Sequence, residues 1–158
     1  MNALLFPGQG SQLVGMGSEF YSNFNTVKDI FEQADDKLNF SLSKIILEGP
    51  ADKLQLTENT QPAILTVSYA IFKILVDEFK FNLETCKYFA GHSLGEYSAL
   101  VCSKALNFED ALYLLHERGK SMQEAVPVGE GNMLAVLGTE INIIKDIIND
   151  LGQKGVCE

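Results

Sequence analysis

The sequence has little positive charge and no long apolar run. Its 158 residues carry 12 Lys and Arg against 21 Asp and Glu, a formal net charge of −9. This balance is poorly suited to a nucleic-acid or anionic-membrane surface, so we expect neither as a partner. No apolar stretch approaches the length that spans a bilayer, and no basic segment precedes an apolar run at the start. We therefore expect a cytoplasmic protein with neither signal peptide nor transmembrane helix.

Cysteine is also scarce. Cys86, Cys102 and Cys157 are odd in number and lie far apart in the chain. They show neither the spacing of a metal site nor that of a redox motif, which favours free thiols in a reducing compartment. We predict no metal and assign the cysteines no function.

The most informative stretch that is present fits the pattern G-x-S-x-G, from Gly91 to Gly95. In that pattern small residues let the backbone fold sharply between a strand and a helix, which leaves the serine exposed as a nucleophile. The apolar run at 88–90 predicts a buried strand before Ser93, and apolar residues at helical spacing follow it. The alternative is a Gly-Ser turn that caps an ordinary helix, since Ser is a preferred N-cap.

A second strand and glycine-rich loop open the chain. Residues 3–6 predict a buried strand that ends at Pro7, and Gly8-Gln9-Gly10-Ser11-Gln12 follows. The loop lacks the Gly-Lys-Ser/Thr of a phosphate-binding loop, and Leu13 stands where a dinucleotide motif needs glycine. Its backbone amides could instead serve an acyl-transfer serine, whose oxyanion needs two donors while the elbow supplies only the N–H of Leu94. A plain tight turn is the alternative.

Besides the helix after Ser93, three amphipathic helices are expected in the first 125 residues. A stripe of apolar residues from Val27 to Leu38 predicts a helix with a capping-box-like start at Thr26 and Asp29. The polar residues 58–61 precede a longer helix with Pro62 in its first turn. Asn107 is the expected N-cap of the third helix.

Arg118 interrupts an apolar row of that third helix, formed with Ala111, Leu115 and Met122. A guanidinium turned toward a core needs a dense acceptor partner, and its planar fork suits a carboxylate. The spacing leaves three interpretations: a structural salt bridge, a substrate carboxylate, or a side chain that reaches solvent at the helix end.

A Pro/Gly segment at 126–131 marks the best domain boundary. Beyond it the pattern predicts a strand at 133–137, an amphipathic helix through Ile141, Ile144, Ile148 and Leu151, a stop at Gly152, and another strand opening at Val156. One helix with so few strands cannot bury its own apolar face. We therefore expect a chain cut short inside a second domain.

Four blocks of this sequence resemble the malonyl-CoA:acyl-carrier-protein transacylases of fatty-acid synthesis: residues 7–12, 60–63, 91–97 and 118–123. The resemblance covers the whole chain but only the N-terminal half of such an enzyme. It implies an α/β fold, with residues 1–125 as part of a large hydrolase-like domain that carries the nucleophile elbow. It also implies that residues 126–158 are the linker, first strand and first helix of a small ferredoxin-like domain.

The resemblance also implies a reaction. Ser93 matches the serine that takes the malonyl group from malonyl-CoA as an ester and passes it to the phosphopantetheine thiol of acyl carrier protein. Gln9 and Leu94 match the residues whose amides form the oxyanion hole, and Arg118 matches the arginine that holds the malonyl carboxylate. The expected partners are malonyl-CoA and acyl carrier protein, with no separate cofactor, and the expected state is a monomer.

The family's catalytic histidine would fall past Glu158. His92 adjoins the serine, where successive side chains diverge, and His116 is expected on the helix surface one position off the Arg118 row. Neither fits the role of the base. We therefore expect the isolated chain to be a poor transacylase, because a general base contributes about 10² to 10⁴ in rate.

Three other functions stay open from the sequence. An α/β serine hydrolase shares the elbow but has no need of Arg118. An acyltransferase of the polyketide type would differ in its acyl group. A carrier-protein docking fragment would bind without forming an acyl-enzyme.

Overall fold

The computed structural model describes residues 2–126 and 136–151. The chain divides into two units, residues 1–127 and 128–158. The sequence predicts this division two residues earlier, after residue 125. The assignment of the second unit to a ferredoxin-like domain stays a prediction.

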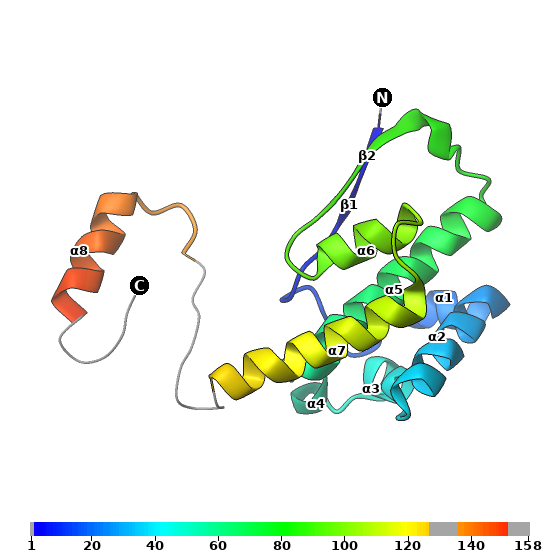
Figure 1. The fold of residues 1–158 in the computed structure, drawn as a ribbon, viewed down its shortest axis with the longest axis horizontal. Helices are drawn as coiled ribbons and strands as arrows, with labels where there is room; N and C mark the ends of the chain where they lie inside the picture. Colours follow the sequence, from blue (N-terminus) through cyan, green and yellow to red (C-terminus); the bar gives the residue numbers. More distant parts are fainter. Residues whose placement is uncertain (1, 127–135, 152–158) are drawn as a thin grey trace. The chain divides into compact units, whose positions relative to one another are not determined.

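The first unit combines a small parallel sheet with seven helices in its described part, so the predicted α/β class is confirmed (Figure 1). The elements are β1 (Asn2–Phe6), α1 (Ser18–Asn23), α2 (Asn25–Leu38), α3 (Leu42–Glu48), α4 (Ala51–Gln55), α5 (Thr57–Asp77), a 3₁₀ turn (Leu83–Thr85), β2 (Cys86–Gly91), α6 (Gly95–Cys102) and α7 (Phe108–Ala125). The expected helix around residues 97–101 is α6.

The sheet consists of β1 and β2, which run parallel with Phe6 opposite Gly91. Leu4, Phe6 and Phe89 share one face and are half-buried, whereas Ala3 and Leu5 share the other face with their partners on β2 and are exposed. Both strands were expected to be buried, and that expectation is wrong: Leu5 is 77% exposed. Parallel sheets are usually covered on both faces, and the described helices cover only one.

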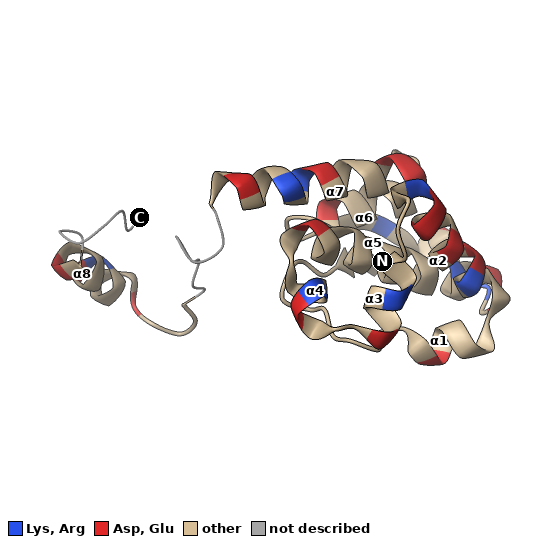
Figure 2. Cartoon of the chain, turned by 90° about the horizontal axis from the view of Figure 1, so that it is seen from below, with Lys and Arg blue, Asp and Glu red and all other residues tan. Residues whose placement is uncertain are grey.

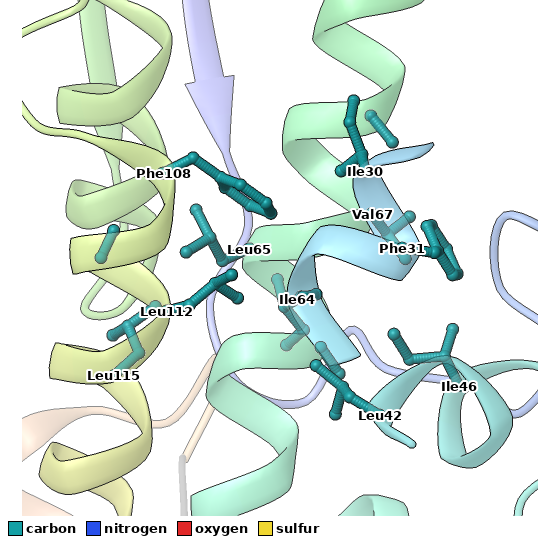
Figure 3. Close-up of a cluster of buried hydrophobic side chains, with 14 of the residues drawn as sticks. Ile30, Phe31, Leu42, Ile46, Ile64, Leu65, Val67, Phe108, Leu112 and Leu115 are labelled. Carbon is teal, nitrogen blue, oxygen red and sulfur yellow. The ribbon is translucent and has the colours of Figure 1, made fainter. Parts of the chain in front are cut away.

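The core lies among the helices rather than on the sheet. Side chains from the six helices α2 to α7 meet in one cluster. Figure 3 labels part of it: Ile30 and Phe31 of α2, Leu42 and Ile46 of α3, Ile64, Leu65 and Val67 of α5, and Phe108, Leu112 and Leu115 of α7. The predicted apolar stripe of α2 is confirmed. Its predicted capping box is wrong, because α2 begins at Asn25 and no side chain bonds its free amides.

Helix α5 begins at Thr57, five residues before the predicted start at Pro62. The polar residues expected before the helix are part of it, and Asn59, Thr60 and Gln61 are buried. Two of them bond carbonyls of α4: Asn59 Nδ2 donates to Lys53 O at 2.9 Å, and Thr60 Oγ1 donates to Leu54 O at 2.5 Å. Tertiary partners therefore satisfy polar groups that sequence pattern assigns to a loop.

Helix α7 crosses the first turns of α5 closely. Asn107 is its N-cap as predicted, with Oδ1 accepting from Glu109 N at 2.8 Å. A Cβ at Gly119 would overlap Glu58 Cα, so only glycine allows this approach. Charged residues of both signs lie on α2 and α7 (Figure 2), and Lys37 of α2 pairs with Asp110 of α7 at 3.9 Å.

In the second unit the structure describes one helix, α8 (Ile141–Leu151), at the position that the sequence predicts. Of the strand predicted at 133–137, only Val136 and Leu137 are described, and they are not in a strand. The predicted stop at Gly152 and strand at Val156 lie outside the described residues. No helix in the described ranges has the length and apolar character needed to cross a membrane.

Candidate active site around Ser93

Ser93 sits at a sharp turn between β2 and α6. Its φ of 54° is left-handed, a conformation that non-glycine residues avoid at a cost of about 1–2 kcal/mol. Gly95 N donates to His92 O at 2.9 Å and Glu96 N donates to Ser93 O at 3.1 Å, which closes the turn. The N-cap of α6 is Leu94 and no side chain caps this helix, so the ordinary N-cap interpretation of Ser93 is wrong.

The two glycines of the motif are required by close backbone contacts. A Cβ at Gly91 would overlap the carbonyl carbon of Gly95, and a Cβ at Gly95 would lie 2.5 Å from Phe6 O. The elbow therefore folds back on its own strand and against the end of β1. The G-x-S-x-G pattern predicts this geometry, and strain held at a serine on such a turn is typical of a reactive site.

The glycine-rich loop after β1 lies beside the elbow. His92 N donates to Phe6 O at 3.2 Å, and a Cβ at Gly8 would overlap the His92 ring. Gln9 follows directly, and its side chain donates to Thr57 Oγ1 of α5 at 3.4 Å. Within residues 2–126 and 136–151, the backbone amides of Gln9 and Leu94 donate no hydrogen bond. Their role as an oxyanion hole stays a prediction.

Arg118 points from α7 to the serine. Its Nη2 donates to Ser93 Oγ at 3.0 Å, and its Nη1 donates to Gln61 Oε1. No carboxylate of the described residues pairs with this guanidinium, so they hold no structural salt bridge to it. The side chain also does not turn outward to solvent at the helix end. Of the three interpretations, the one that places Arg118 at the acyl site agrees best with this geometry.

Gln61 is a site residue that the analysis of the sequence missed. It is fully buried, and its Nε2 donates to Met122 Sδ at 3.4 Å while its Oε1 accepts from Arg118. Its presence in the block 60–63 was the available signal. That block carries no spacing that would assign a role.

The two histidines lie near the site without bonding Ser93. His92 is exposed at the elbow. The expectation that His116 is a surface residue is wrong, because it is half-buried, its Nδ1 lies 3.0 Å from Glu58 O and its ring lies 5.4 Å from that of Phe40. A carbonyl only accepts, so Nδ1 carries the proton in this bond and His116 is occupied away from Ser93.

The described cysteines, Cys86 and Cys102, are unbridged. Burial raises the pKa of the Cys102 thiol to about 12. This thiol is therefore protonated near neutral pH and chemically inert. Cys157 lies outside the described residues.

Comparison with known proteins identifies the class of this site. Residues 3–151 match the family described as the acyl transferase domain, and the chain belongs to that family. It is 48% identical over 153 residues to the malonyl CoA-acyl carrier protein transacylase of Bacillus subtilis strain 168, covering 97% of this chain and 47% of the relative. The resemblance inferred from the four sequence blocks is thereby confirmed.

Solved structures agree. The acyl-carrier-protein S-malonyltransferase from Bartonella henselae superposes with a TM-score of 0.89 at 44% identity, over 100% of this chain and 51% of that one. A malonyl-transacylase in complex with a type II polyketide acyl-carrier protein gives a TM-score of 0.86 at 40% identity, over 98% and 49%. The chain thus spans about half the length of these relatives.

Proposed function

We propose that this chain supplies the acyl-carrying serine and the carboxylate-binding arginine of a malonyl transferase that serves fatty-acid biosynthesis. The observation that carries the proposal is the 3.0 Å hydrogen bond from Arg118 Nη2 to Ser93 Oγ at a left-handed elbow. A serine nucleophile needs an exposed hydroxyl, and a malonyl group needs a cation within reach of its free carboxylate. The two groups meet here.

In the proposed reaction Ser93 Oγ attacks the thioester carbonyl of malonyl-CoA. The amides of Gln9 and Leu94 stabilise the resulting oxyanion, and its collapse expels the coenzyme A thiol and leaves a malonyl ester on Ser93. The phosphopantetheine thiol of acyl carrier protein then attacks this ester and regenerates the hydroxyl. Malonyl-CoA and the carrier protein act as substrates, and no further cofactor or metal is invoked.

The proton of Ser93 needs a base that neither His92 nor His116 provides in the described geometry. We place that base in sequence past Glu158, as the family resemblance implies, and residues 126–158 at the start of a ferredoxin-like domain. On this proposal the protein works as a monomer.

Intact mass after incubation with malonyl-CoA tests the proposal. We expect a malonyl adduct on the parent chain that forms slowly without the base, and none on Ser93→Ala. Ser98→Ala is the matched control, since Ser98 is a buried serine of α6 that bonds no group in the described structure, and it should keep the adduct. An equal adduct on Ser93→Ala would refute the proposal.

Two of the alternatives predict different products. A hydrolase would release malonate to water and would process a neutral ester equally well after Arg118→Ala. A polyketide acyltransferase would also form an ester on Ser93, but with the acyl group of another acyl-CoA. A guanidinium beside the nucleophile favours an acyl group with a free carboxylate over a neutral acyl group. This preference favours the malonyl transferase over both alternatives.

A further inference from the structure

The buried amide of Gln61 links the two helices that hold the site. It is fully buried on α5, and both ends of the amide have partners on α7. Arginine only donates, so Oε1 must face Arg118, and Nε2 then donates to Met122 Sδ at 3.4 Å. The orientation of the amide is therefore determined by its two neighbours.

The position of this amide is itself fixed. The turn of α5 that carries Gln61 is tied to α4 by the side chains of Asn59 and Thr60. Gly119, the neighbour of Arg118, lets α7 approach that turn closely. Gln61 thus presents an acceptor to Arg118 from a rigid support.

We propose that Gln61 is a positioning residue that aims the Arg118 guanidinium at the acyl site and makes the site selective for acyl groups bearing a carboxylate. An arginine side chain has about 2 kcal/mol of rotamer entropy, so a fixed acceptor reduces the ordering cost that a substrate must meet. The acceptor is neutral. An Asp or Glu would order Arg118 equally well but would cancel the charge that attracts the carboxylate.

This inference rests on the proposed function. Two variants separate the effect of ordering the Arg118 side chain from the effect of changing the charge beside it. Gln61→Met keeps the length of the side chain and removes the acceptor. Gln61→Glu keeps an acceptor and adds a negative charge. Gln33→Met makes the same exchange at an exposed position of α2 and serves as the control.

The first measurement is by NMR and does not depend on acylation of Ser93. We expect a resolved, slowly exchanging Arg118 Nε–H signal in the parent, in Gln33→Met and in Gln61→Glu, and its broadening in Gln61→Met. Titration with malonate should give a Kd about tenfold higher in both Gln61 variants than in the parent, with acetate binding too weakly to distinguish them. Circular dichroism establishes that each variant is folded.

The second measurement is the ratio of malonyl to acetyl adduct on Ser93 in the same proteins. Both Gln61 variants should lower this ratio about tenfold. A purely structural Gln61 would lower the melting temperature and leave both the ratio and the malonate Kd unchanged, which would overturn the inference. If the parent binds no malonate, the proposed function fails instead, and the Arg118 signal in Gln61→Met still decides whether Gln61 orders the guanidinium.

Discussion

Two polar residues of α7, His116 and Arg118, both bond residues near the start of α5, but one serves the backbone of that helix and the other serves the site. His116 Nδ1 donates to the Glu58 carbonyl at 3.0 Å. In a regular helix that carbonyl would accept from residue 62, but Pro62 has no N–H. His116 therefore completes the backbone of α5, whereas Arg118 bonds the side chain of Gln61 and turns its remaining donors to Ser93.

The difference teaches how to separate a structural polar residue from a functional one. His116 is bonded to a group that would otherwise be unsatisfied, so its removal should cost stability. Arg118 is bonded to a neutral amide and a hydroxyl, neither of which needs a cation. Its charge is thus available to a substrate, and its removal should cost activity.

The largest effect is expected at Gly119, because the close crossing of α7 and α5 places both His116 and Arg118 against their partners. Gly119→Ala places a Cβ against Glu58 Cα and must push α7 away from α5. We expect a loss of about 3 kcal/mol in the free energy of unfolding, because overpacking against backbone relaxes poorly. Urea denaturation measures it, with Glu124→Ala on the exposed end of α7 as the control. Equal stability of the two variants would contradict the close crossing.

Removal of the charge should affect chemistry more than stability. Arg118→Met should lower the rate of malonyl adduct formation about 100-fold, the value of one or two charge-assisted hydrogen bonds. The free energy of unfolding should fall by only about 1 kcal/mol, because the buried Oε1 of Gln61 loses its donor. Timed intact-mass measurements with malonyl-CoA and acetyl-CoA check this. An equal loss with both acyl groups would show that Arg118 does not read the carboxylate.

His116→Phe should show the reverse. The ring keeps its contact with Phe40, but the Glu58 carbonyl loses its donor, so we expect a loss of about 1–2 kcal/mol in the free energy of unfolding. The malonyl adduct should form as in the parent. The double variant with Pro62→Ala restores a backbone N–H for that carbonyl, and there the His116→Phe change should cost less. An equal cost in the presence and absence of Pro62 would show that His116 does not replace the N–H that Pro62 lacks.

The smallest effect is expected from Glu117, which lies between His116 and Arg118 in the sequence. Glu117 and Lys120 pair at 2.9 Å on the exposed side of α7. Their hydrogen bond lowers the pKa of Glu117 below 4.5 and raises that of Lys120 above 10.5. Any stabilisation by this pair is therefore complete at pH values between the ordinary pKa of a glutamate and that of a lysine. It is lost as the pH falls through the lowered pKa of Glu117, and also as the pH rises through the raised pKa of Lys120. Thermal melts of Glu117→Gln across pH should differ little from the parent, and less still in high salt.

Local patterns predicted much of the site. The spacing of Gly91, Ser93 and Gly95 predicts the elbow because those residues are in direct backbone contact. The helical row predicts which side of α7 carries Arg118. Both features depend on neighbours within a few residues.

Long-range partners explain what was missed. The polar residues 58–61 have the composition of a loop and form a helix because α4 and α7 satisfy them. The role of Gln61 and the bond of His116 depend on a contact between residues nearly sixty positions apart. The exposed face of the sheet was also missed, because an apolar strand pattern does not say which faces other elements cover.

Identification of the residue that carries the acyl group tests the central claim most directly. After incubation with malonyl-CoA, the chain would be cleaved at Lys87 and Lys104 and the intervening peptide fragmented by mass spectrometry. We predict the malonyl ester on Ser93 alone, and not on Ser98 or Ser103 of the same peptide. An ester at either of those serines, or no ester both in this chain and in a version extended past Glu158, would contradict the account.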